Sequence, residues 1–123
     1  MAIRLPGTTV HAEDRYGLSV MNKGKAKGYA WTWMERVDPK KARVANMGVL
    51  AVVVPNLSVK EMILSSDGRA YFTEPHYNGF PAVLVRLSEI EPADLEDLLI
   101  EAWRCKASVE LQREFTLNPG HDL

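Results

Sequence analysis

Runs of hydrophobic residues separated by turn residues predict five short β-strands in this chain. The run at residues 48–54 is continuous and β-branched, which is typical of a strand buried on both faces. The run at residues 29–35 alternates instead, and a period of two places Tyr29, Trp31 and Trp33 on one face. We expect strands at residues 18–22, 29–35, 48–54, 70–73 and 82–87.

Towards the C-terminus the pattern changes to the period of an α-helix. Pro92 suits the first position of a helix, and the segment after it places apolar residues at i, i+3, i+4, i+7 and i+8 with acidic residues opposite. Residues 109–115 predict a final short helix. The apolar stripe of the longer helix consists of Leu95, Leu98, Leu99, Ala102 and Trp103.

A shorter helix is predicted between the third and fourth strands. Ser58 and Glu61 have the spacing of a capping box, in which the two side chains satisfy free backbone N–H groups at the start of a helix. Val59, Met62 and Ile63 would then form its apolar face.

The resulting order, β-β-β-α-β-β-α-α, indicates an α+β fold in which an antiparallel sheet carries helices on one face. A chain of 123 residues fits one compact domain, here residues 1–123. We expect residues from about 116 to 123 to form a flexible tail.

Composition favours a cytoplasmic protein without a membrane partner. No apolar run approaches the roughly 20 residues of a membrane-spanning helix, and the first six residues lack the apolar segment of a signal peptide. The single Cys105 cannot form an internal disulfide, which fits a reducing compartment.

The net charge of −1 conceals a strong asymmetry. Residues 1–60 hold ten Lys and Arg against four Asp and Glu, whereas residues 61–123 hold five against twelve, so the halves carry +6 and −7. Such a basic half can attract an anionic partner. Alternatively, the two halves neutralise each other within one molecule or between neighbours.

The basic residues concentrate in two predicted turns. Residues 23–28 are flanked by glycines, and residues 38–41 contain an Asp-Pro pair that is typical of a turn. From such turns the side chains could contact the phosphates of a nucleic acid such as DNA, or they could be solvated surface groups. The candidate nucleic-acid-binding residues are Lys23, Lys25, Lys27, Lys40, Lys41 and Arg43.

His76 is the candidate for catalytic chemistry. A general base needs an orienting carboxylate, and Glu74 lies two residues from His76. The adjacent Tyr77 adds a phenol. The alternative is that His76 bonds the local backbone of a turn. His11 and His121 are expected in loops or tails, and the histidines lack metal-ligand spacing, so we predict no metal, no cofactor and no catalytic residue.

The three aromatic residues of the second strand allow two interpretations. Tyr29, Trp31 and Trp33 could form a stacking platform for nucleic-acid bases, or they could be core. The choice depends on which face of the sheet the helices cover.

The segment at residues 71–87 resembles the TPHYxGYP-AVLVRL signature of the MmcQ/YjbR family of small bacterial proteins. The turn of this segment contains four residues of the family motif, and the resemblance implies no role for them. They are Pro75, His76, Tyr77 and Gly79. Residues 28–31 resemble the family's K-x-FAW strand, residues 50–54 its LAVRV strand, and residues 92–104 its ELxELLxEAWR helix.

The resemblance implies a compact fold that is similar to CyaY-like and secretion-chaperone-like folds. Members are often labelled DNA-binding because their fold is described as a double wing, and no catalytic residue is implied. The family usually has a helix before the stretch that matches residues 5–7. Only five residues precede Pro6 here, so we expect part of the sheet to be exposed or paired with another subunit.

Three functional hypotheses follow from the sequence. The first is a non-enzymatic binding module that contacts nucleic acid through its basic half. The second is a protein-interaction or chaperone-like module that forms a homodimer through its sheet. The third is an enzyme that uses His76.

Overall fold

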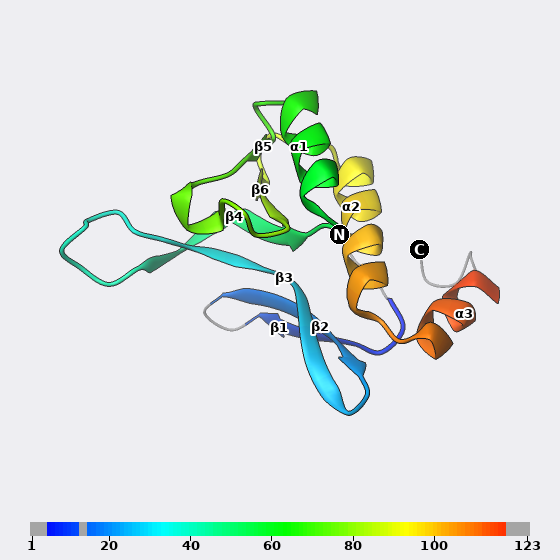
Figure 1. The fold of residues 1–123 in the computed structure, drawn as a ribbon. Helices are drawn as coiled ribbons and strands as arrows, with labels where there is room; N and C mark the ends of the chain where they lie inside the picture. Colours follow the sequence, from blue (N-terminus) through cyan, green and yellow to red (C-terminus); the bar gives the residue numbers. More distant parts are fainter. Residues whose placement is uncertain (1–4, 13–14, 118–123) are drawn as a thin grey trace.

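A computed structural model describes residues 5–12 and 15–117 (Figure 1). Six antiparallel strands form one sheet in the order β1-β2-β3-β4-β6-β5. Its strands are β1 (Thr8–Ala12), β2 (Tyr16–Asn22), β3 (Lys25–Glu35), β4 (Val44–Val53), β5 (Tyr71–Phe72) and β6 (Ala82–Arg86). The helices are α1 (Leu57–Ser66), α2 (Pro92–Lys106), α3 (Val109–Leu117) and a 3-10 turn, η1 (Pro75–Tyr77).

This architecture confirms the α+β class and the antiparallel sheet. None of the helices in the described ranges is long and apolar enough to cross a membrane. The tail expected from about residue 116 lies mostly outside the described residues, which end at 117, and the backbone of residues 116 and 117 completes α3.

Strand β1 was not predicted from the sequence. Val10 is the only large apolar residue of its Thr-Thr-Val-His-Ala sequence, so no alternation marks it. It forms the edge of the sheet, where four of its five residues are exposed and an apolar face is not required. At the opposite edge, β5 has two residues rather than the expected four.

The lysine-rich turn is shorter than predicted. Strand β3 begins at Lys25, so only Lys23 and Gly24 connect it to β2. Their φ angles, +53° and +78°, lie in the left-handed region that two-residue hairpin turns of type I′ require. Lys25 and Lys27 therefore belong to a paired strand rather than to a loop.

A β-bulge in β3 separates Tyr29 from the two tryptophans. Leu18 pairs with Ala30 and Ser19 with Gly28, so Tyr29 is an extra residue that reverses the alternation of side chains. Tyr29 lies in the core beneath the helices, whereas Trp31 and Trp33 pack on the cluster of the other face. The prediction that all three share one face is therefore wrong.

The main core lies between the sheet and the helices. Trp103 of α2 has no exposed surface, and its indole Nε1 donates a hydrogen bond of 2.9 Å to the carbonyl oxygen of Pro6. Leu99 and Ala102 are buried beside it, and Leu95 and Leu98 are partly buried, which confirms the predicted stripe. Figure 1 shows α1 and α2 together on one side of the sheet, with α3 following the end of α2.

Helix α1 begins one residue before the predicted capping position. The side chain of Asn56, not Ser58, caps it, and the amide oxygen accepts a hydrogen bond of 2.9 Å from the backbone N–H of Val59. Met62 is 65% exposed, so it is not part of the apolar face, while Lys60 is buried. The capping box and the position of Met62 were therefore predicted wrongly.

A second, smaller cluster lies on the face without helices. It contains five buried residues of β4, β6 and η1, and Trp31, Trp33 and Phe72 pack around it. The loop between β5 and β6, which includes η1, supplies its cover through Tyr77. Its buried members are Val49, Ala51, Tyr77, Ala82 and Leu84.

Candidate functional site

A single row of cross-strand neighbours runs over all six strands on the face without helices. The strand registers pair each member with the next, and paired residues point to the same side of a sheet. Four members belong to or pack on the second cluster, which identifies the face. The row consists of His11, Gly17, Trp31, Ala51, Leu84 and Phe72.

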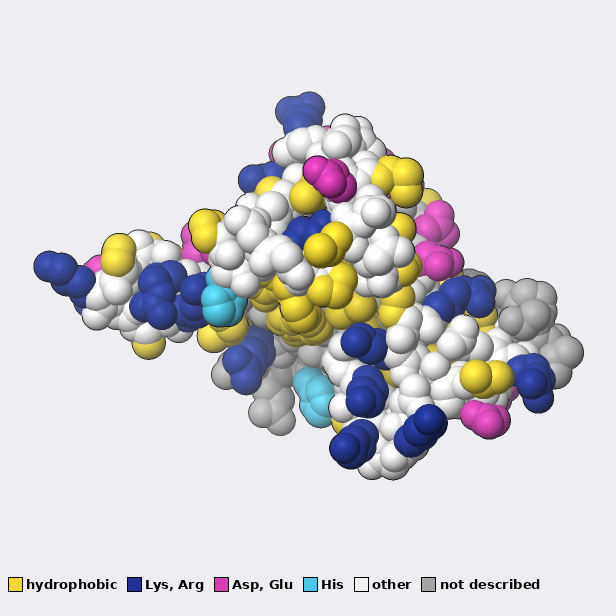
Figure 2. Space-filling model, viewed as in Figure 1, with side chains coloured by type: hydrophobic (Ala, Val, Ile, Leu, Met, Phe, Trp, Pro, Cys, Tyr) yellow, Lys and Arg dark blue, Asp and Glu magenta, His cyan; other side chains and the backbone are white. Residues whose placement is uncertain are grey.

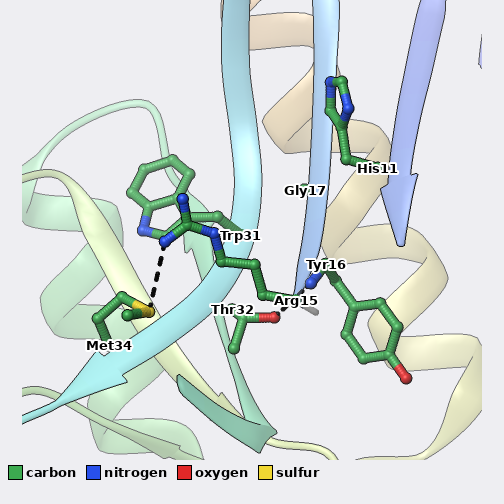
Figure 3. Close-up of a pocket in the computed structure, with 7 residues that line it drawn as sticks. All are labelled: His11, Arg15, Tyr16, Gly17, Trp31, Thr32 and Met34. Carbon is green, nitrogen blue, oxygen red and sulfur yellow. Dashed lines mark hydrogen bonds between the residues drawn. The ribbon is translucent and has the colours of Figure 1, made fainter. Parts of the chain in front are cut away.

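A groove of about 610 Å³ opens at the β1–β2–β3 end of this row. Gly17, in the middle strand, contributes no side chain between its two neighbours in the row (Figure 3). This volume lies within the range of about 300–1,000 Å³ that small-molecule sites occupy. The side chains that line the groove are His11, Arg15, Tyr16, Trp31, Thr32 and Met34.

The indole of Trp31 forms a fixed wall of this groove. Its Nε1 donates a hydrogen bond of 3.1 Å to the hydroxyl of Tyr77, and its ring centroid lies 6.4 Å from that of Phe80. A smaller hollow of about 230 Å³ is also lined by Trp31, together with His76, Tyr77 and Phe80. One half-buried tryptophan is thus shared by two adjoining hollows.

Arg15 brings a cation to the rim of the groove. Its guanidinium Nη1 donates to the sulfur of Met34 at 3.6 Å, which Figure 3 marks with a dashed line. A thioether is a weak acceptor, so a stronger anionic acceptor would compete for the guanidinium. The neighbouring Tyr16 is held by its backbone N–H, which donates to the hydroxyl of buried Thr32 at 2.7 Å.

Lys60 anchors the loop that supports Trp31. Its ammonium donates to the carbonyl oxygens of Tyr77 at 2.6 Å and Phe80 at 2.9 Å, and the side chain is only 5% exposed. Desolvation by burial lowers its pKa. Sequence reasoning missed this role, because a lysine in a short surface helix is ordinarily solvated.

His76 is exposed and is not assembled into an acid–base pair. Its imidazole lies edge-to-face with the ring of Tyr77, at 5.9 Å between centroids. Among the described residues, Glu74 forms no hydrogen bond with it, and the buried Oε1 of that carboxyl has no partner there. The alternative bond from His76 to local backbone is likewise not found in this part of the chain.

The other histidines do not complete a metal site in the described ranges. His11 lies in β1 rather than in a loop, and His121 lies outside the described residues. No group of three His, Cys, Asp or Glu side chains within residues 5–12 and 15–117 is placed to hold a metal ion. Cys105 is exposed on α2, and its thiol donates to the carbonyl oxygen of Glu101 at 3.2 Å.

The six candidate basic residues do not converge on one patch. Lys23, Lys25 and Lys27 lie at the tip of the β2–β3 hairpin, whereas the other three lie in the turn between β3 and β4, so the two groups occupy opposite ends of β3. Figure 1 shows these hairpins extending in different directions, and Figure 2 shows basic side chains on both. The groove lies between them, because Trp31 is near the middle of β3.

The second basic turn is held by its own arginines. The guanidinium of Arg43 donates to the carbonyl oxygen of Met34 at 3.0 Å, and that of Arg36 donates to the carbonyl oxygen of Lys41 at 2.7 Å. The predicted turn at residues 38–41 is present, since the N–H of Lys41 donates to the carbonyl oxygen of Asp38 at 3.0 Å. Arg43 thus has a structural role beside any contact with a ligand.

The acidic half of the chain lies mainly on the helix side. Most of the acidic residues between positions 89 and 101 are carried by α2, which covers the opposite face from the groove. In Figure 2 acidic side chains appear along the edge where α2 lies, and others appear close to basic side chains. The sheet therefore separates the acidic residues of α2 from the groove.

Comparison with known proteins gives bacterial relatives without an assigned function. The chain is 44% identical over 72 residues to uncharacterised proteins of Mycobacterium bovis and Mycobacterium tuberculosis. The matched part is 58% of this chain and 56% of each relative, so the chain spans little more than half the length of these curated relatives. No protein-family model and no solved structure matches the chain.

Proposed function

We propose that this protein is a non-enzymatic module that binds nucleic acid, and that it is an MmcQ/YjbR protein with the double-wing fold of that family. Supporting the family assignment, the segments that resemble the family fall on defined elements. Residues 28–31 lie in β3, residues 50–53 end β4, and residues 92–104 lie in α2. A cytoplasmic location is part of the same proposal.

The observation that carries the proposal is the arrangement along β3. Basic side chains stand at both ends of this strand, and a groove with an aromatic wall and the cation of Arg15 lies between them. Eleven residues at about 3.3 Å each span at most about 36 Å. An extended polyanion lying along β3 would meet positive charge at each end and Trp31 between.

Alternation along β3 limits how the lysines take part. Lys27 pairs with Val20, whose side chain points into the main core, so the side chain of Lys27 leaves the strand on the helix side. Lys25 is two residues away and therefore points to the same side. Their long side chains are exposed at the narrow tip of the hairpin. There they can reach a ligand that bends around the edge of the hairpin. Such contacts go to phosphates, so binding should be weak, tolerant of sequence and sensitive to salt.

The test is fluorescence anisotropy with a fluorescein-labelled 20-nucleotide strand and its duplex at low salt. The variant Lys23→Ala/Lys25→Ala/Lys27→Ala should weaken binding about equally for all sequences and reduce the salt slope by roughly one for each phosphate that is no longer bound. Arg69→Ala is the control, because it removes an exposed cation next to β5, at the other edge of the sheet. No binding at tens of micromolar protein would refute the proposal.

A second candidate is a protein-interaction or chaperone-like module that forms a homodimer through its sheet. The edge strand β1 favours it, because within the described chain β1 pairs only with β2 and its Val10 is 61% exposed. Light scattering after gel filtration tests it: a dimer that Val10→Lys converts to a monomer would support this candidate. The enzyme hypothesis at His76 gains no comparable observation.

A further inference from the structure

Gly17 leaves a gap in the row of side chains between His11 and Trp31, and this gap is here called the slot. These residues are neighbours in one row over β1, β2 and β3, and Figure 3 shows the imidazole and the indole on either side of Gly17. The backbones of β1 and β3 are two strand spacings apart, about 9.5 Å. A planar group in contact with a ring on each side needs about 7–8 Å, twice a van der Waals contact of 3.5–4.0 Å.

We propose that this slot binds an unpaired base of a single-stranded nucleic acid, between the rings of His11 and Trp31. The inference rests on the nucleic-acid binding proposed above and names the form of nucleic acid. A base within a duplex is stacked on both faces, whereas an unpaired base exposes them to aromatic side chains. The slot therefore favours single strands over duplexes.

The surroundings of the slot suit a base that is linked to a phosphate. Arg15 lies at the rim, two residues before Gly17, and its hydrogen-bond acceptor among the described residues is the sulfur of Met34. A phosphate oxygen is a much stronger acceptor than a thioether for a guanidinium. The positive charge of Arg15 therefore favours a base that carries a phosphate over an uncharged aromatic ligand.

The slot is rigid on one side and adjustable on the other. The hydrogen bond from Trp31 to Tyr77 holds the indole, and Tyr77 is held in turn through the contact of its carbonyl with Lys60. His11 is exposed on the edge strand, so its ring can adjust to the ligand. A platform that is ordered before binding reduces the entropy cost of binding.

Gly17→Val fills the slot with little effect on the fold. A Cβ atom at this position would lie 3.7 Å from the Cβ of His11 and 3.8 Å from its Cδ2, which are ordinary van der Waals contacts. The matched control is Ala26→Val, which adds a β-branched side chain on the same face of the sheet near the hairpin tip, since Ala26 pairs with Met21. Thermal melts of both variants should stay close to that of the wild type.

The probes are a fluorescein-labelled thymidine 12-mer and a 12-base-pair duplex, measured by anisotropy with the full chain. Wild type should prefer the single strand, and Gly17→Val should weaken that binding by about 5- to 150-fold, the range for one stacked base, while duplex binding stays within about twofold. Ala26→Val should bind both probes like wild type. His11→Ala, at an exposed position, should weaken single-strand binding with no loss of stability.

Two contrary outcomes separate this inference from the proposal on which it rests. If the lysine variant loses affinity but Gly17→Val binds the thymidine 12-mer as tightly as wild type, the slot is refuted and phosphate binding stands. If neither probe binds the wild-type protein, both proposals fail.

Discussion

The two faces of the sheet differ in what covers them and in how completely their polar atoms are paired. On the helix side, Trp103 and Tyr29 are almost fully buried and both polar groups are bonded, to Pro6 and to Thr8. On the other side one short loop provides the cover, and Trp31 and Trp33 stay half-buried. The helix side is thus the more completely packed face, and the groove lies on the other.

Buried polar atoms without a partner occur in Trp33 and in the loop between β5 and β6. Among the described residues, the buried Nε1 of Trp33, Oγ1 of Thr73 and Oε1 of Glu74 have no hydrogen-bond partner. Each such atom costs free energy of folding, because it has lost water without gaining a protein partner. The helix side therefore contributes more to stability, while the loop side retains groups and space that a ligand can use.

The largest expected effect comes from truncating the tryptophan of the helix side. Trp103→Ala should lower the free energy of unfolding by about 3–5 kcal/mol, because it opens a large cavity and orphans the carbonyl of Pro6. Trp33→Ala is the matched change on the other face. It should cost at least about 1 kcal/mol less, since Trp33 is half-buried and its unpartnered N–H is removed. Equal shifts in guanidinium denaturation would mean that the two faces contribute alike.

Removing the buried lysine should have the next largest effect. Lys60→Met keeps most of the length of the side chain but removes the two charge-assisted hydrogen bonds to the carbonyls of Tyr77 and Phe80, which should cost about 1–3 kcal/mol. Each carbonyl keeps one backbone donor, the N–H of Phe80 or of Ala82. Lys27→Met, at an exposed position, should change stability by less than about 0.5 kcal/mol. Urea melts of both variants provide the measurement. An equal midpoint for Lys60→Met and wild type would show that the loop does not depend on Lys60.

The sequence predicted the buried stripe of α2 well, because one local pattern determines it. The stripe of α2 repeats over two turns, so Leu99 and Trp103 could be assigned to the core without knowledge of their partners. The continuous apolar run of β4 likewise predicted a buried strand, and β4 lies in the interior of the sheet between β3 and β6. The burial of such elements can be predicted from their own hydrophobic pattern.

The sequence could not predict the groove, because strand register creates it. The neighbourhood of His11, Gly17 and Trp31 requires the unrecognised strand β1 and the bulge at Tyr29. A bulge of one residue reverses every later side chain, and no local pattern marked it. The burial of Lys60 depends in the same way on carbonyl groups 17 and 20 residues further along the chain.

A smaller effect is expected from the bond that fixes the wall of the groove. Trp31→Phe and Tyr77→Phe each remove one partner of the 3.1 Å hydrogen bond, and a double-mutant cycle isolates their coupling. We expect a coupling energy of about 1 kcal/mol, the usual net value of a hydrogen bond. A coupling energy near zero would show that the indole is held by packing with Phe80 alone.

The smallest effect at neutral pH, and the clearest dependence on pH, should come from Tyr29→Phe. The variant loses the 3.0 Å hydrogen bond with Thr8, which should cost about 0.5–1.5 kcal/mol. Burial raises the pKa of Tyr29, and the bond with Thr8 offsets part of that rise. Because the folded-state pKa lies above that of the unfolded chain, near 10, wild type loses stability as pH rises from about 10 through the folded-state pKa. The variant lacks this loss, so its stability deficit relative to wild type should shrink in that pH window.

Thr8→Val is the control, because it removes the hydrogen bond but keeps the phenol of Tyr29. Its stability deficit relative to wild type should not shrink. Urea melts at pH 7 and at about pH 10.5 measure both, and a constant deficit for Tyr29→Phe would show that the phenol ionises alike in the folded and unfolded states.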